Sequence, residues 1–148
     1  MLRLVLVCFV IFLLPACYSK SEYEDVSSHM QYSRLIGNRF ETLAPLVVHG
    51  VTLDQNYKKV IEVFVVTVEP GFGGPEVLMR RDLPVGSIVS IEKVLRCSTC
   101  LPSYIEYEIN FLSENIGSDI PVRLDDLSIK NNKGSLILNP DVFRKLNN

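Results

Sequence analysis

The feature that most constrains the fold is an alternation of apolar and polar side chains with a period of two. In residues 104–112, Ile105, Tyr107 and Ile109 alternate with charged and amide side chains. This is the pattern of a strand with one buried face and one face in water. Residues 60–68 are almost continuously apolar and β-branched, which predicts a central strand covered on both faces.

Six further segments have strand composition: residues 40–43, 46–51, 76–80, 88–95, 121–124 and 135–138. Clusters of Gly, Pro, Asn and Asp separate the strands and predict turns at residues 54–56, 70–75, 84–86, 116–119 and 131–134. Many short strands at regular spacing predict a mainly β fold, either a small antiparallel β-barrel or a sandwich. Only residues 139–146 predict a helix, because Asn139 is a capping residue and Pro140 suits the first helical position.

The N-terminal residues have the three parts of a secretory signal: Arg3, an unbroken apolar run over residues 4–14, and the small residue Ala16. The run is too short to cross a hydrocarbon layer of about 30 Å, which needs about 20 residues. We therefore expect residues 1–16 to be removed. The tetrad Leu14-Pro15-Ala16-Cys17 resembles the lipobox of bacterial lipoproteins, whose cysteine is acylated and becomes the mature N-terminus. A plain secretory signal and a short buried strand are the alternatives.

The lipoprotein resemblance implies a location. Cys17 would carry a diacylglycerol thioether and an amide-linked acyl chain, and at about 0.8 kcal/mol per buried methylene this anchoring is effectively permanent. In that family, Asp directly after the acceptor cysteine is associated with retention in the inner membrane. Tyr18 stands there in this chain, which implies the outer membrane and its periplasmic face, with the inner membrane left open.

Behind the signal we expect a lipidated N-terminus with a flexible tether over residues 17–33, and a single β domain over residues 34–148. The tether segment is rich in Ser and charge and has no sustained apolar period. Loss of Arg3 with the signal changes the formal net charge from −2 to −3. The basic residues do not cluster, so the composition argues against a nucleic-acid partner.

Residues 82–94, Asp-Leu-Pro-Val-Gly-Ser-Ile-Val-Ser-Ile-Glu-Lys-Val, resemble the turn and strand of bacterial Src-homology-3-like barrels. In those domains a Leu, a two-residue step and a Gly precede a strand of the form Ser-apolar-Val-x-Ile. The resemblance covers thirteen residues and favours the barrel over the sandwich. Such domains of bacterial envelopes often bind peptidoglycan or peptides, although a fold does not fix a function.

Two cysteines remain once Cys8 leaves with the signal and Cys17 is acylated: Cys97 and Cys100. In the oxidising periplasm they predict a structural disulfide, worth about 2 kcal/mol or less across so short a loop. A redox pair is one alternative, although redox motifs of the thioredoxin type open a helix, and a strand follows residues 101–103 here. Half of a metal site is the other, although a closed zinc site needs four ligands.

No catalytic residue, metal site or cofactor is predicted, and we do not expect an enzyme. His49 stands alone in a strand, where a surface position is the simpler interpretation, and no nucleophile motif accompanies it. Glu106 with Glu108, and Asp125 with Asp126, suit a solvated strand face better than general acid and base roles.

Three aromatic residues are candidate ligand contacts: Phe72, Tyr104 and Tyr107. Phe72 lies in the loop 70–75, whose three glycines and two prolines predict a tight turn. The loop either presents Phe72 to a ligand or tucks its ring onto the end of the domain. Tyr104 and Tyr107 carry the same ambiguity between contact surface and core.

Two functions follow from this reading of the sequence. The first is a non-catalytic, lipid-anchored binding or scaffold module of the bacterial cell envelope, whose partner is peptidoglycan or an envelope protein. The second is an immunity or inhibitor lipoprotein that blocks a toxin or a cell-wall hydrolase, since a net negative charge suits a basic enzyme.

Overall fold

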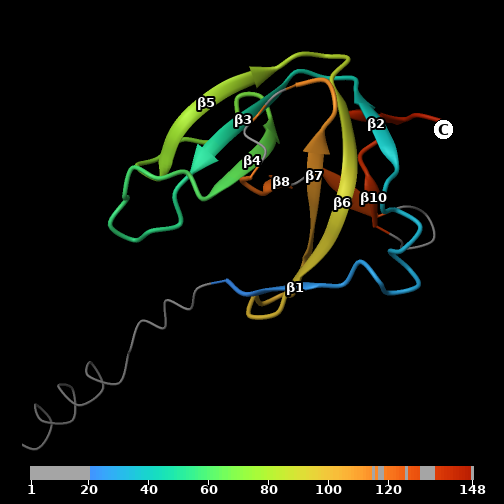
Figure 1. The fold of residues 1–148 in the computed structure, drawn as a ribbon, viewed down its shortest axis with the longest axis horizontal. Helices are drawn as coiled ribbons and strands as arrows, with labels where there is room; N and C mark the ends of the chain where they lie inside the picture. The colour runs from blue at the N-terminus through green and yellow to red at the C-terminus, as the bar shows by residue number, and fades with distance from the viewer. Residues whose placement is uncertain (1–20, 115, 117–118, 126, 131–135, 148) are drawn as a thin grey trace, which may run out of the picture.

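A computed structural model describes residues 21–114, 116, 119–125, 127–130 and 136–147 (Figure 1). Several predicted features lie outside the described residues, namely the signal over residues 1–16, Cys17, Tyr18, Asp126, the turn 131–134 and part of the turn 116–119. The strands are β1 (Tyr23–Asp25), β2 (Arg39–Thr42), β3 (Leu46–Val51), β4 (Val63–Val68), β5 (Val77–Leu83), β6 (Ile88–Cys97), β7 (Ile105–Phe111), β8 (Val122–Leu124), β9 (Ser128–Lys130), β10 (Leu136–Leu138) and β11 (Phe143–Lys145). In the described residues no helix is long and apolar enough to cross a membrane.

Within the described residues, nine strands form one mixed sheet in the order β11-β2-β6-β7-β8-β4-β3-β5, and β1 also pairs with β6 (Figure 1). The β4–β8 pair is parallel and the other ladders of this sheet are antiparallel. Strands β9 and β10 form a separate antiparallel pair. The mainly β fold that the sequence predicts is therefore confirmed.

The longest strand, β6, organises one half of this sheet. Strand β1 pairs with its last residues and β2 with its first, so both lie along one edge of β6 while β7 occupies the other. The β6–β7 register shifts between Ile91 and Lys93, which makes Glu92 the extra residue of a β-bulge. The bulge reverses the alternation of β6, so Val89, Ile91 and Val94 all face the core.

One hydrophobic core joins the two halves of the sheet. Buried side chains from β2, β3, β4, β5, β6, β7 and β8 belong to a single cluster, with Leu46, Val48 and Val66 from one half and Ile91 and Tyr107 from the other. The period-two pattern of β7 directs Tyr107 into this core and Glu106 to the opposite face. Since the outer face of β6, β7 and β8 carries the polar side chains, a functional site is expected there.

The predicted closed barrel is wrong. Within the described residues no ladder joins the edge strands β5 and β11, so the sheet is open. The parallel β4–β8 pair also departs from the all-antiparallel arrangement expected for the barrel or the sandwich. The reason is the position of β8, which pairs antiparallel with β7 on one side and parallel with β4 on the other.

The predicted C-terminal helix is also wrong. Asn139 does cap a turn, because its side-chain oxygen accepts a hydrogen bond from the Asp141 amide at 3.0 Å. Its carbonyl accepts from the amides of Val142 and Phe143 at 3.0 and 2.9 Å, which completes one turn. The chain then extends as β11 and pairs with β2, since Phe143 gains more burial in the core there than on an isolated helix.

The predicted flexible tether does not extend over residues 21–33. Strand β1 pairs with β6, and the side chain of Val26 is fully buried in the core. The Val26 amide donates to the Val94 carbonyl at 2.9 Å, and Ser27 Oγ accepts from the Val94 amide at 2.9 Å. The domain therefore includes residues that the sequence assigns to the tether, because Val26 is buried in the core and Tyr32 packs against it, within a segment rich in polar residues.

We predict that Val26→Ala lowers the free energy of unfolding by about 2 kcal/mol, because two buried methyl groups are lost and a cavity remains. The matched control is Val60→Ala, at a side chain that is 60% exposed, where the change should stay within about 0.5 kcal/mol. Urea unfolding of the two variants measures the difference. Equal stability of both would mean that residues 21–33 do not pack on the domain.

Candidate binding cleft and disulfide end

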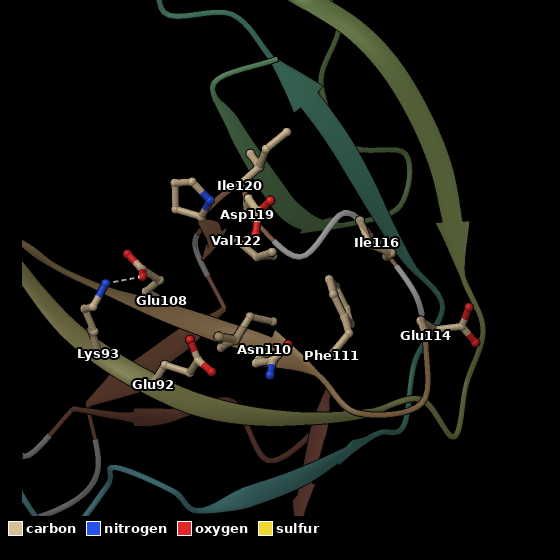
Figure 2. A pocket seen from close by; sticks show the side chains of 12 residues that line it. Glu92, Lys93, Glu108, Asn110, Phe111, Glu114, Ile116, Asp119, Ile120 and Val122 are labelled. Atoms are coloured by element: carbon tan, nitrogen blue, oxygen red, sulfur yellow. Dashed lines mark hydrogen bonds and ion pairs between the residues drawn. The ribbon is translucent and has the colours of Figure 1, made fainter.

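A cleft of about 540 Å³ opens beside the middle of β6 and the end of β7 (Figure 2). Four carboxylates and one ammonium line it together with apolar side chains. Its wall residues are Glu92, Lys93, Glu108, Ile109, Asn110, Phe111, Glu114, Ile116, Asp119, Ile120, Pro121 and Val122. We call it the acidic cleft.

The strand geometry explains why the cleft lies there. Strand β8 pairs with β7 only as far as Ile109, so Asn110 and Phe111 have no ladder partner on that side among the described residues. The bulge at Glu92 turns two consecutive residues, Glu92 and Lys93, out of the core, where they form the opposite rim. A strand end and a bulge thus leave a gap in an otherwise continuous sheet.

The cleft is net negative. Lys93 Nζ donates to Glu108 Oε1 at 2.6 Å, and this hydrogen bond raises the pKa of Lys93. Glu114 Oε2 accepts from Arg81 at 2.9 Å. Since these two cations face four carboxylates, the cleft favours a ligand that brings positive charge. Among the described residues, no group of three or more His, Cys, Asp or Glu side chains is arranged to hold a metal ion.

Sequence reasoning missed the acidic cleft. Its carboxylates come from β6, from β7 and from the segment after β7, and only the fold brings them together. One signal was present, because the adjacent polar pair Glu92 and Lys93 interrupts the alternation of the strand predicted over residues 88–95. Two consecutive polar residues within a strand are the mark of a bulge, which often lies beside a functional site.

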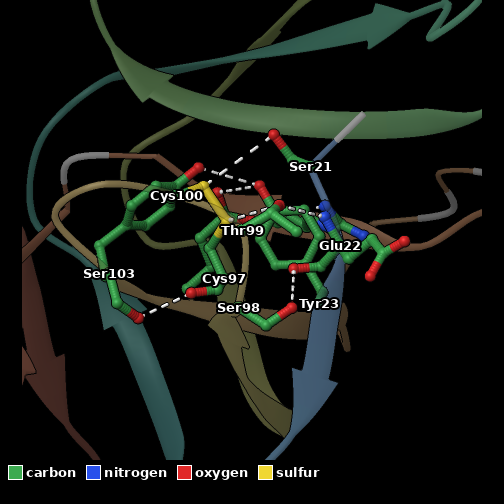
Figure 3. Close-up of a disulfide and its surroundings, with 11 residues drawn as sticks. Ser21, Glu22, Tyr23, Cys97, Ser98, Thr99, Cys100 and Ser103 are labelled. Atoms are coloured by element: carbon green, nitrogen blue, oxygen red, sulfur yellow. Dashed lines mark hydrogen bonds and ion pairs between the residues drawn. A yellow bond between two sulfur atoms is a disulfide. The ribbon is translucent and has the colours of Figure 1, made fainter. Parts of the chain in front are cut away.

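At the end of β6, a disulfide links Cys97 and Cys100, with Cα atoms 5.5 Å apart (Figure 3). The Cys97 amide donates to the Tyr104 carbonyl at 3.0 Å, and Ser103 Oγ donates to the Cys97 carbonyl at 2.7 Å. These bonds and the disulfide close residues 97–103 into a compact loop between β6 and β7, which we call the disulfide loop.

Beside the disulfide loop, four polar side chains form a connected cluster on the outer face. Tyr23 Oη donates to Glu106 Oε1 at 3.0 Å and lies 3.0 Å from Tyr104 Oη. The Arg123 guanidinium lies 4.2 Å from the centre of the Tyr23 ring and 3.6 Å from Glu106 Oε2. The cluster covers the buried residues Leu95 and Cys97 on this face, so it is first of all a structural layer.

The expectation that Glu106 and Glu108 form a solvated acidic face is wrong. Only 15% of the Glu106 side chain and 12% of the Glu108 side chain are exposed, and each faces a cation. Burial raises the pKa of Glu106, and the hydrogen bond from Tyr23 and the charge of Arg123 offset only part of this effect. Burial also raises the pKa of Tyr23.

The two candidate tyrosines differ in burial. Tyr107 is 1% exposed, so it belongs to the core and its proposed role as a ligand contact is wrong. Burial raises the pKa of its phenol to about 12. Tyr104 remains 43% exposed at the base of the disulfide loop. The alternation of β7 already distinguishes the two, because Tyr107 shares its face with Ile109 and Phe111.

His49 on the outer face of β3 is in ring contact with Phe72. The expectation of a surface position for His49 is wrong, since its side chain is fully buried and its ring centre lies 4.3 Å from that of Phe72. Gly71, at φ +73°, lets the loop approach so closely that a Cβ there would collide with the imidazole. Phe72 thus tucks onto the sheet, and the interpretation as a ligand-facing tip is not supported.

The imidazole of His49 is held in an apolar setting. Nε2 lies 3.4 Å from Thr67 Oγ1, and Nδ1 has no hydrogen-bond partner among the described residues. Burial lowers the pKa of His49, and the positive charge of Arg80 lowers it further. The folded state therefore favours neutral His49.

We predict that Glu106 makes stability fall as pH rises. Its folded-state pKa lies above the usual value of 4.5, so the folded state binds this proton more tightly than the unfolded state. The stabilisation is complete below that value and is lost as pH rises through the raised pKa. Urea unfolding of Glu106→Gln at a series of pH values should lack this part of the decline. The exposed control Glu92→Gln should retain it, and an unchanged slope in Glu106→Gln would contradict the assignment.

We predict that the contribution of His49 to stability has the opposite pH dependence. Because its folded-state pKa lies below 6.5, its contribution to stability is present above that value and is lost as pH falls toward the lowered pKa. Phe72→Ala should uncover the ring and raise the pKa of His49. NMR titration of the His49 imidazole signals in the variant and in the wild type measures the shift. An identical His49 titration in Phe72→Ala and wild type would show that Phe72 does not shield the ring.

Comparison with known proteins gives no match, so the acidic cleft and the disulfide loop are interpreted from their own residues. No family model, no curated protein and no solved structure matches this chain.

Proposed function

We propose that this protein is a non-catalytic, lipid-anchored binding module of the bacterial cell envelope, and that its acidic cleft holds a peptide segment bearing a basic group. The observation that carries the proposal is the composition of that cleft. Carboxylates of Glu92, Glu114 and Asp119 surround a wall that includes Phe111 and Ile120. A cavity of about 540 Å³ that combines charged side chains with apolar ones can both hold a ligand and fix its orientation.

The ligand to which the proposal commits is a peptide stem of peptidoglycan. Such stems present the free amino group of a diamino acid beside small apolar side chains. The carboxylates of the cleft would bind this amino group, not the carboxylates that the stem also carries. The unladdered end of β7 at Asn110 and Phe111 adds backbone groups that an extended peptide could use. A basic segment of an envelope protein offers similar chemistry and is an outcome of the test below.

The proposed location rests on the sequence alone. The tetrad ending at Cys17 supports acylation of that residue, and Tyr18 after it supports the periplasmic face of the outer membrane. A binding module held there would meet the cell wall, which is consistent with the proposed ligand.

The inhibitor alternative keeps only one of the two features that favoured it. The net negative charge of the chain remains, but the second feature was an acidic strand face at Glu106 and Glu108 that could meet a basic enzyme. Both carboxylates are mostly buried and each faces a cation on its own chain. Tight binding of a single soluble toxin or hydrolase, without binding to cell wall, would restore this alternative.

We predict that the full-length protein in detergent sediments with purified peptidoglycan sacculi, and that the double variant Glu92→Gln with Asp119→Asn binds roughly tenfold more weakly. About 1.4 kcal/mol of lost charge attraction in the cleft corresponds to that factor. The matched control removes the same charge from exposed residues outside the cleft, through Glu69→Gln with Asp141→Asn.

Added salt should weaken binding of the wild type more than that of the cleft variant, because salt screens the two carboxylate charges that the variant lacks. Equal sedimentation of wild type, cleft variant and control would exclude the cleft as the binding site. Sedimentation of none of them would exclude a peptidoglycan ligand.

A further inference from the structure

We infer that the disulfide loop, residues 97–103, contacts the lipid surface in which the protein is anchored. This inference rests on the proposed acylation of Cys17. If so, the domain has a defined membrane-facing end, and the disulfide loop that forms this end is distant from Cys17 in the sequence. Three observations lead to it: the docking of residues 21–22, the length of chain between them and Cys17, and the chemistry of the loop.

The first described residues are fixed to the disulfide loop. The Glu22 amide donates to Thr99 Oγ1 at 3.0 Å, and its carbonyl accepts from the Ser98 amide and hydroxyl at 2.9 and 3.1 Å. Ser21 lies beside the disulfide, with its Oγ 4.0 Å from Cys100 Sγ. Figure 3 shows Ser21, Glu22 and Tyr23 alongside the loop. The chain therefore enters the domain at this loop.

The chain before Ser21 is too short to hold the loop far from the anchor. Four peptide units connect Cys17 to Ser21, and at a maximum of about 3.6 Å per residue they span at most about 14 Å. The polar zone on each side of a bilayer is roughly 5 to 7 Å deep, judged from its overall and hydrocarbon thicknesses. With an acylated Cys17 at that zone, even a fully extended segment keeps Ser21, and the disulfide loop beside it, within about 14 Å of the anchor.

The loop has the side chains that suit such a surface. Residues 97–105 carry no charged side chain. Leu101, at the tip, is 99% exposed, and Tyr104 at the base is 43% exposed. A tyrosine is favoured at a membrane interface, where its ring is partly buried and its hydroxyl stays wet. A single exposed leucine is common on any protein, but this one lies where the chain length brings the domain to the lipid.

The chain contains no tryptophan, so a single introduced tryptophan reports on one position only. Leu101→Trp places the probe at the tip of the loop. The matched control is Val85→Trp, at a residue that is 57% exposed just before the opposite end of β6. Ten residues of β6 separate the two sites, or roughly 33 Å of strand. Both positions are exposed, so neither substitution disturbs the core.

The experiment uses full-length protein produced in bacteria and reconstituted into phosphatidylethanolamine and phosphatidylglycerol vesicles, with and without brominated lipids. Mass spectrometry of the N-terminal peptide and flotation with the vesicles are measured first. We expect emission from Leu101→Trp to move to shorter wavelength on vesicles and to be quenched by brominated lipid. Val85→Trp should show neither change.

The outcomes separate the two proposals. A Cys17 without acyl chains, or protein that does not float, overturns the lipid anchor and the loop contact together. An acylated, floating protein whose Leu101→Trp emission matches that of Val85→Trp overturns only the loop contact. A shift to shorter wavelength that brominated lipid does not quench would assign the loop to a second copy of the chain, and also overturns the lipid contact.

Discussion

The hydrogen-bond ladders of β6 are the constraint on which the rest of the structure depends. Strand β6 pairs with β7 along one edge and with both β1 and β2 along the other. It therefore joins the N-terminal segment, the middle of the chain and, through β2, the C-terminal strand β11. The two candidate functional features lie along it, since the acidic cleft opens beside Glu92 and Lys93 in its middle and the disulfide loop begins at its last residue, Cys97.

The bulge at Glu92 connects the packing of β6 with the chemistry of the cleft. Without the extra residue, strict alternation would place Lys93 in the core and turn Val94 outward. With it, Val94 stays buried, and Lys93 lies opposite Glu108 on the outer face. The same irregularity therefore preserves the core and supplies one rim of the cleft. A bulge stabilised by an ion pair at a site is a feature that folds retain for function rather than a defect.

The sequence was sufficient for the strands whose apolar pattern is strong, such as β3, β4, β6 and β7. It was insufficient where pairing partners distant in the chain decide the structure. Tyr23–Asp25 forms β1 because β6 offers an edge, and Phe143–Lys145 forms β11 because β2 does, although the cap at Asn139 would also start a helix. The acidic cleft was missed for the same reason, since only the fold brings Asp119 and Glu92 to one cleft. By contrast, the burial of Tyr107 follows from the alternation of its own strand and could have been predicted.

The placement of β1 has a mechanical consequence. Strand β1 begins beside Cys97 and runs antiparallel to β6, so it points from the disulfide loop toward the body of the domain. A pull on the chain before Ser21, against a load held at the acidic cleft, acts along the axis of β1. Hydrogen bonds between strands lie across that axis, so the three paired residues and the Glu24–Arg96 ion pair would be loaded together in shear, not one after another. In a domain held by a membrane at one end and by a rigid wall at the other, β1 would therefore separate from β6 only when all of these interactions broke together.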